Sequence, residues 1–177
     1  MMYMLSRKTW VVVLCALSLM RCSFLAGTPS MLPPGPHKLM VLPFTGRGPG
    51  LSLRNGHIAA DRLTAYLYMY RHYPVVDRSQ VNDLLQQAGK ANVYFLSRAS
   101  LCALADTLDA SVVVLGLIEN QPAEVGGQHP LHRLVITLRF LDGRTGEILH
   151  IVQRRAESRA PLTQVIDDML RALVDKL

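Results

Sequence analysis

The 177-residue chain carries a formal net charge of +6, and half of its residues are hydrophobic. This length is enough for one domain with a hydrophobic core and a short leader. Three basic residues lie in the first 22 positions, so the 19 basic residues fall to 16, against 13 acidic ones, in the remainder. A net charge of only +3 there, with 6% aromatic residues, argues against nucleic-acid binding.

Residues 1–22 have the order of a secretory signal peptide. Arg7 and Lys8 give a positively charged start, and Thr9 to Met20 is a mostly apolar run of 12 residues. A membrane-spanning helix needs about 20 apolar residues, so this run is too short to be one. The alternative, a buried first helix of the domain, is disfavoured because residues rich in proline follow. The sequence therefore predicts export.

Cys22 stands directly after the apolar run, where a bacterial lipoprotein carries its lipidated cysteine. The stretch Leu19-Met20-Arg21-Cys22 resembles a lipobox, with Leu19 at the apolar position. Arg21 departs from the small residue expected before the cysteine. Cys22 is therefore the predicted lipid attachment site, and cleavage near Ala26-Gly27 without lipid is the alternative.

Residues 23–36 contain four prolines and two glycines and predict a linker. Such a tether suits a domain held away from a membrane surface. The remainder, residues 38–177, is predicted to be a single domain.

The domain begins with an apolar segment, Lys38 to Phe44, that predicts a strand with Pro43 at its end. The glycine-rich stretch Thr45 to Gly50 follows and predicts a flexible loop. A strand followed by a glycine loop invites comparison with phosphate-binding loops, but neither of their motifs is present. We therefore expect a connector here.

A helix is predicted from about Asn55 to His72. One face follows the spacing i, i+4, i+7, i+8 and i+11, which gives Ala59, Leu63, Tyr66, Leu67 and Tyr70. The tyrosines of this face are expected to be half-buried packing residues. The 100° step per residue places Tyr68 on the opposite side, next to Met69. Exposed aromatic and methionine side chains are enriched at interfaces, so Tyr68 and Met69 are the candidate partner-contact residues.

The stretch from Tyr73 to Glu119 is the predicted centre of the fold. Pro74 to Arg78 predicts a short strand that turns into a helix, with Asp77 as N-cap and Gly89 after the last turn. Leu101, Leu104, Ala105 and Leu108 share one face of a second helix. Ser111 to Ile118 is an almost continuous apolar run, as in a strand covered on both faces. Cys102, in the second helix, is expected to be a small buried side chain.

The last third of the chain predicts a loop, a hairpin and a helix. Asn120 to His132 is rich in Gly, Gln and Pro and predicts a long loop; its His129 and His132 lack a third metal ligand. Residues 133–140 alternate in polarity and residues 147–155 return as the partner strand, joined by a turn that contains two glycines. Pro161 is the predicted first residue of the final helix. Its apolar stripe is Leu162, Val165, Ile166, Met169, Leu173 and Leu177.

Four local patterns, in the same order along the chain, resemble the CsgG-like family of curli secretion components. They are Leu39–Phe44, Tyr73–Ser79, Leu104–Gly116 and Asp142–Ile148. The same fold is shared by the amino-terminal domain of TolB, by FlgO-like flagellar lipoproteins and by lipoprotein activators of penicillin-binding proteins. The resemblance implies an α/β domain with a single mixed sheet of about five strands packed with about four helices. It also implies an envelope lipoprotein that works through protein contacts.

Three functions are compatible with these patterns. The favoured one is a non-enzymatic adaptor or assembly factor on the periplasmic side of the cell envelope, anchored through its lipid and contacting an envelope protein. It needs no cofactor, no metal and no nucleic acid, and it allows an oligomer. The second is a subunit of a CsgG-like secretion pore. The third is a small secreted hydrolase, although neither the G-x-S-x-G nor the H-E-x-x-H motif is present.

Overall fold

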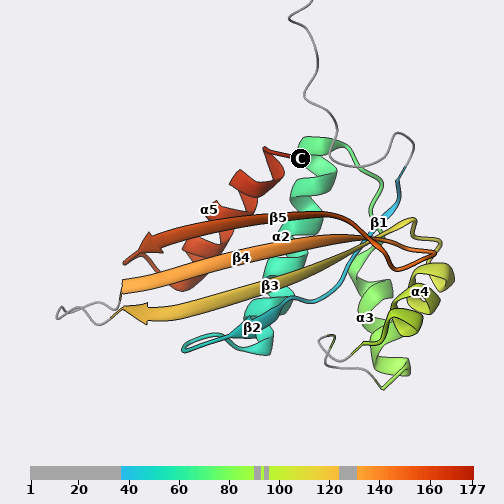
Figure 1. Ribbon diagram of the computed structural model, residues 1–177, viewed down its shortest axis with the longest axis horizontal. Coiled ribbons are helices and arrows are strands. Elements are labelled where there is room, and N and C mark those ends of the chain that lie inside the picture. The colour runs from blue at the N-terminus through green and yellow to red at the C-terminus, as the bar shows by residue number, and fades with distance from the viewer. Residues whose placement is uncertain (1–36, 90–92, 94–95, 124–130) are drawn as a thin grey trace, which may run out of the picture. The chain divides into compact units, whose positions relative to one another are not determined.

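The computed structural model describes residues 37–89, 93, 96–123 and 131–177. In these residues the chain forms one mixed five-stranded sheet and four helices, as Figure 1 shows. The predicted α/β class with a single mixed sheet is therefore confirmed. In chain order the elements are β1 (Leu39–Val41), β2 (Thr45–Arg47), α2 (Leu53–Arg71), α3 (Arg78–Gln87), α4 (Arg98–Thr107), β3 (Val112–Ala123), β4 (Leu131–Asp142), β5 (Ile148–Ser158) and α5 (Leu162–Val174).

Strand β3 is the centre of the sheet. Strands β1 and β2 both pair with it in parallel, β4 pairs with it antiparallel, and β5 pairs with β4. The alternation of side chains along β3 sends Val112 and Val114 into one hydrophobic core and Val113 into another. The prediction of a strand covered on both faces is thus confirmed for the first part of β3.

Helices α2 and α5 cover one whole face of the sheet. The alternating positions of β4 supply this core with Leu134, Ile136, Leu138 and Phe140, all at most 1% exposed, as their period of two predicts. Pro161 is the N-cap of α5 rather than its first helical residue. The buried stripe of α5 is also wider than predicted. It comprises Val165, Ile166, Met169, Leu170, Leu173 and Val174, with Leu177 buried just beyond the helix.

Helices α3 and α4 cover only part of the opposite face. Their core includes Met40 and Leu42 from the first segment and Leu141 from β4, but no residue of β5. Asp77 caps α3 by accepting a hydrogen bond from the Ser79 backbone N–H at 2.7 Å, as its position predicts. The remainder of this face, over β4 and β5, has no helix among the described residues (Figure 1).

Three predicted boundaries are wrong. The first strand stops at Val41, and the predicted loop from Thr45 opens with a second short strand, β2. Ladder pairing with β3 is interrupted over residues 42–44, where Pro43 has no N–H to donate, and it resumes at Thr45. The strand predicted before Asp77 is only a bridge between Val75 and Leu39. The loop predicted from Asn120 to His132 begins within β3 and ends within β4, whose pairing runs from Val112 opposite Asp142 to Ala123 opposite Leu131; its middle, 124–130, lies outside the described residues.

Phe44, between β1 and β2, lies in the core that α2 and α5 cover and is 2% exposed. A Cβ at Gly116 of β3 would lie 2.3 Å from the Phe44 ring, and a Cβ at Gly56 of α2 would lie 2.0 Å from the Phe44 carbonyl oxygen. Only glycine fits at either position. These two glycines let the aromatic ring fill the space between α2 and the sheet.

Candidate functional site

The outward face of α2 near its C-terminal end carries exposed apolar side chains. Tyr68 is 63% exposed, Met69 51% and Tyr70 45%. The helix phase accounts for this, since Leu63 and Leu67 point into the core and are fully buried. The outward position predicted for Tyr68 is confirmed. Half-buried packing, as predicted for the tyrosines of the other face, is found for Tyr70, whereas Tyr66 is more deeply buried at 7% exposed.

Tyr70 contacts α5 rather than the core, and this leaves it 45% exposed. The Arg171 Nη2 donates a hydrogen bond to the Tyr70 hydroxyl at 2.7 Å, and the guanidinium carbon lies 5.5 Å from that ring and 5.9 Å from the Tyr66 ring. The Tyr66 hydroxyl donates to Asp167 at 2.6 Å, and Arg62 donates to the same carboxylate at 2.9 Å. Burial, followed by the hydrogen bond to Asp167, raises the pKa of Tyr66. These contacts hold α2 against α5.

The sequence could not reveal this network, because Arg171 lies 101 residues from Tyr70. Its effect is to fix Tyr70 against α5 and to hold the end of α2 in place. We name the exposed side chains Tyr68 and Met69 the α2 patch. An aromatic and a thioether side chain on a rigid helix can bind a protein partner with little loss of side-chain entropy.

The β4–β5 connection is built on Asp142, which lies in one of the motifs that carry the resemblance. Its Oδ1 accepts hydrogen bonds from the backbone N–H groups of Thr145 at 2.7 Å and Arg144 at 2.9 Å. The Thr145 hydrogen bond is the largest cause that lowers the pKa of Asp142. Gly143 packs so closely on the α4–β3 connection that a Cβ would lie 2.3 Å from the Ala110 carbonyl oxygen.

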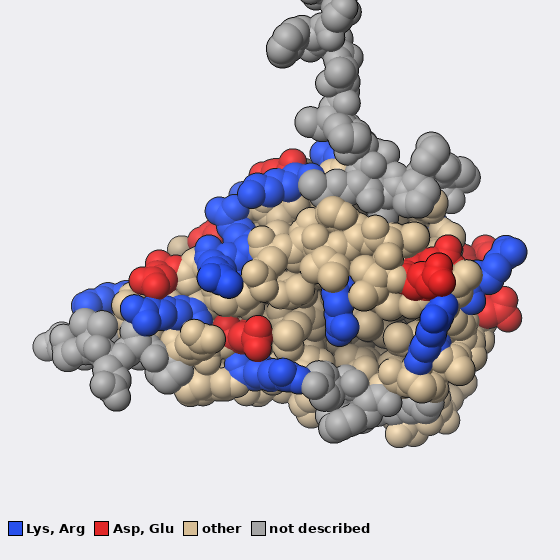
Figure 2. Space-filling model, in the orientation of Figure 1, with Lys and Arg blue, Asp and Glu red and all other residues tan. Residues whose placement is uncertain are grey.

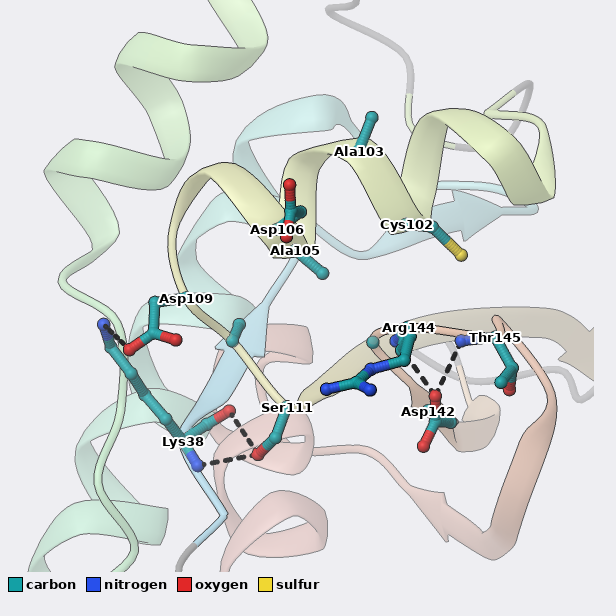
Figure 3. Close-up of a pocket in the computed structure, with 12 residues that line it drawn as sticks. Lys38, Cys102, Ala103, Ala105, Asp106, Asp109, Ser111, Asp142, Arg144 and Thr145 are labelled. Carbon is teal, nitrogen blue, oxygen red and sulfur yellow. Dashed lines mark hydrogen bonds and ion pairs between the residues drawn. The ribbon is translucent and has the colours of Figure 1, made fainter.

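A pocket of about 820 Å³ lies between this connection and α4 (Figure 3). Arg144 and Lys38 point into it from below α4, and Asp106, Asp109 and Cys102 face it from α4 and the residues that follow (Figure 3). Cys102 is partly exposed here, so the prediction that it is buried is wrong.

Two of the charged side chains that line this pocket, Lys38 and Asp109, contact other groups of the protein. Lys38 Nζ donates to the Leu108 carbonyl oxygen at 2.8 Å and lies 3.8 Å from the Asp109 carboxylate. No histidine is among the described residues that line the pocket, so Cys102 has no imidazole base there. The arrangement stabilises the loops and offers no assembled nucleophile.

The glycine-rich loop after β2 is held by β3. The Asn120 Nδ2 donates to the Pro49 carbonyl oxygen at 2.8 Å and lies 3.3 Å from the His132 Nδ1. A Cβ at Gly48 would lie 2.0 Å from the Asn120 carbonyl oxygen. Gly48 therefore serves close packing against β3.

The remaining predicted site residues fall into two groups. Of the two histidines considered for metal, His129 lies outside the described residues and His132 contacts Asn120. The described residues contain no group of three His, Cys, Asp or Glu side chains that could hold a metal ion.

Cys22, the predicted signal peptide and the linker 23–36 all lie outside the described residues. Among the helices that are described, none combines the length and the apolar character needed to cross a membrane.

No family model matches the sequence, and no curated protein matches it. Several solved structures are similar in fold. Lipoprotein GNA1162 from Neisseria meningitidis is 16% identical, with a TM-score of 0.58 over 80% of this chain and 97% of that one. The C-terminal domain of LpoB from Salmonella enterica is 16% identical, with a TM-score of 0.53 over 80% and 93%. The PelC dodecamer from Paraburkholderia phytofirmans is 17% identical, with a TM-score of 0.55 over 82% and 92%. The chain thus shares the fold of bacterial lipoprotein domains.

Proposed function

We propose that this protein is a non-enzymatic adaptor or assembly lipoprotein of the bacterial cell envelope that binds a partner protein through the α2 patch. The observation that carries the proposal is the patch itself. Tyr68 and Met69 are more than half exposed on a helix that Tyr66, Tyr70 and Arg171 hold against α5. An exposed tyrosine beside an exposed methionine on a rigid helix has the composition of an interface.

Two further observations support an envelope location. The first 22 residues have the order of a signal peptide, with Cys22 at the position of a lipidated cysteine. The fold is shared with lipoprotein GNA1162. In this proposal Cys22 anchors the chain to a membrane, residues 23–36 form the tether, and residues 38–177 are the binding domain. The finer assignment to a CsgG-like, FlgO-like or TolB-like protein rests on the four sequence patterns.

Site-specific photo-crosslinking tests the partner contact. A photoreactive phenylalanine at position 68, in the full-length protein in living cells, should capture one defined partner that mass spectrometry identifies. The same residue at Arg54, exposed near the start of the same helix, is the matched control and should not capture it. Equal capture from both positions, or none from position 68, contradicts the proposed surface.

A ring assembly that forms a secretion pore is the second candidate. The observation that favours it is the fold shared with PelC, which forms a dodecamer. The mass of the full-length protein in detergent separates the two functions. A stable ring of many copies supports the pore, and a monomer supports the adaptor.

A further inference from the structure

Strand β5 forms a long open edge of the sheet. It pairs with β4 from His132 opposite Ser158 to Leu141 opposite Ile148, and no strand among the described residues pairs with its other side. The edge at β1 is closed, since the Leu39 N–H donates to the Pro74 carbonyl oxygen at 2.8 Å and the Leu39 carbonyl oxygen accepts from Val76 at 2.8 Å. Figure 1 shows β5 as the outermost strand.

Apart from a pairing irregularity at its start, the first half of β5 lacks the features that normally block an exposed edge. Proteins protect such edges with proline, short strands, bulges or charged side chains, because unpaired backbone N–H and C=O groups bind other strands. Ile148–Ser158 has 11 residues with no proline or glycine. Ile148 and Ile151 are 53% and 50% exposed. An irregularity in pairing occurs only at its start, opposite Phe140 and Leu141.

The second half of β5 is cationic. Arg154 and Arg155 lie in this half, and the exposed Arg159 follows it. The acidic residue here, Glu157, is already bound to Arg133 of β4 at 2.9 Å. None of the three arginines forms an ion pair with another described residue. Basic side chains are also visible over this end of the sheet in Figure 2.

From this edge we infer a second binding site, which takes an extended segment of a partner protein as an added strand. The segment has acidic side chains against Arg155 and Arg159 and aliphatic side chains against Ile148 and Ile151; Arg154 lies on the other face of the sheet, since it pairs with the buried Ile136. Backbone hydrogen bonds to β5 supply the affinity, and the side chains at alternate positions supply the specificity. The site goes beyond the α2 patch and lets one domain join two proteins.

A second copy of this chain fits the edge less well. Two β5 strands paired antiparallel about their midpoint, Gln153, set Arg155 of each opposite Ile151 of the other. That arrangement brings no acidic group to Arg155, and the Glu147 that it sets opposite Arg159 already forms an ion pair with Arg98 at 3.5 Å. A partner strand with acidic side chains forms ion pairs with these arginines. Charge complementarity therefore favours a different protein over a second copy of this chain.

A designed peptide tests the site on the full-length protein in detergent micelles. The probe has 11 residues, with Glu and Thr alternating in its first half and Val and Thr in its second, as an antiparallel strand requires. Hydrogen–deuterium exchange should show slower exchange in Ile148–Ser158 when the peptide is added. A peptide with Lys in place of Glu should bind at least tenfold more weakly by fluorescence anisotropy.

Charge reversal locates the contact. Arg155→Glu should weaken the Glu peptide at least tenfold and improve the Lys peptide. Arg54→Glu makes the same charge change at an exposed position of α2 and should leave both affinities unchanged, which makes it the matched control. Ile151→Lys should weaken both peptides. Tyr68→Ala should not alter peptide binding, so that failure of this site and failure of the α2 patch are distinguishable.

Three results would overturn the inference. The first is exchange protection outside β5, and the second is equal affinity for the Glu and Lys peptides. The third is self-association of the peptide-free protein that Ile151→Lys abolishes, which would assign the edge to a second copy of the chain. Sedimentation of the wild-type protein and of this variant decides the last point.

Discussion

At the scale of single residues, replacing Tyr68 should affect partner binding without affecting the stability of the fold. Its side chain is 63% exposed, and no hydrogen bond to its hydroxyl is formed among the described residues. Tyr68→Ala should therefore weaken capture of the partner while changing the free energy of unfolding by no more than about 0.5 kcal/mol. A pull-down from whole cells and a thermal melt measure the two effects. A strong loss of stability would show that the side chain belongs to the core.

Gly143 is a residue whose replacement should be costly for steric reasons. A Cβ there would meet the Ala110 carbonyl oxygen at 2.3 Å, and backbone atoms on both sides have little freedom to move. Gly143→Ala should lower the free energy of unfolding by about 2–3 kcal/mol. Gly89→Ala is the control, because Gly89 has a φ of +64° but open space around it, and should cost only about 1 kcal/mol. Chemical denaturation that gives equal losses would contradict the steric explanation.

Asp142 should make stability depend on pH in the acid range. Backbone hydrogen bonds, that of Thr145 first, lower the pKa of Asp142 in the folded state. Because an unfolded aspartate titrates near a pKa of about 3.9, this carboxylate stabilises the fold above that pH, and the contribution is lost as the pH falls through the folded pKa.

Asp142→Asn removes this titration but keeps an acceptor oxygen. Its free energy of unfolding should vary less than that of the wild type between about pH 5 and pH 2. Urea unfolding across that range measures the difference, with Asp168→Asn, an exposed position on α5, as the control. Parallel pH profiles for wild type and Asp142→Asn would show that the turn does not depend on the charge.

At the scale of elements, α5 is the largest single contribution to the core that can be removed as a unit. Six side chains of α5 are buried, and Leu177 just beyond the helix is the seventh. They are Val165, Ile166, Met169, Leu170, Leu173, Val174 and Leu177. At about 1.5–3 kcal/mol for each burial, their loss exceeds roughly 10 kcal/mol, which is comparable with a typical total stability of about 5–15 kcal/mol.

Truncation after Arg159 should therefore abolish the cooperative thermal transition. Loss of Leu177 alone should only lower the melting temperature, because a single burial is removed. Calorimetry of the two truncated proteins distinguishes these results. A cooperative melt of the protein that ends at Arg159 would show that α5 is peripheral to the fold.

At the scale of the whole molecule, the anchor decides where the domain works. We expect the mature protein to begin at Cys22 and to carry lipid, because the charged start, the apolar run and the cysteine occur in the order of a lipoprotein signal. Mass spectrometry of the mature N-terminus tests this. Cys22→Ser should release the protein from the membrane fraction. A mature start near Ala26 or Gly27, or an intact Met1, would contradict lipidation.

The sequence by itself determined the features that depend on local periodicity. Apolar residues spaced three and four apart placed the helices. The apolar residues at every second position of β4 identified its buried side chains, because successive side chains of a strand point to opposite faces of the sheet. The same helix phase placed Tyr68 outside the core. Asp77 and Gly89 marked the ends of α3, since caps depend on neighbouring backbone groups alone.

Only the tertiary structure decided the features that depend on distant partners. Thr45–Arg47 and the polar end of β3 are strands because β3 and β4 offer them backbone partners, which no periodicity records. Tyr70 is half-buried, as its spacing predicts, but its partner Arg171 lies on α5, 101 residues away, and the spacing cannot show that contact. The open edge of β5 likewise follows from strand order, and strand order is set by packing between segments far apart in the chain.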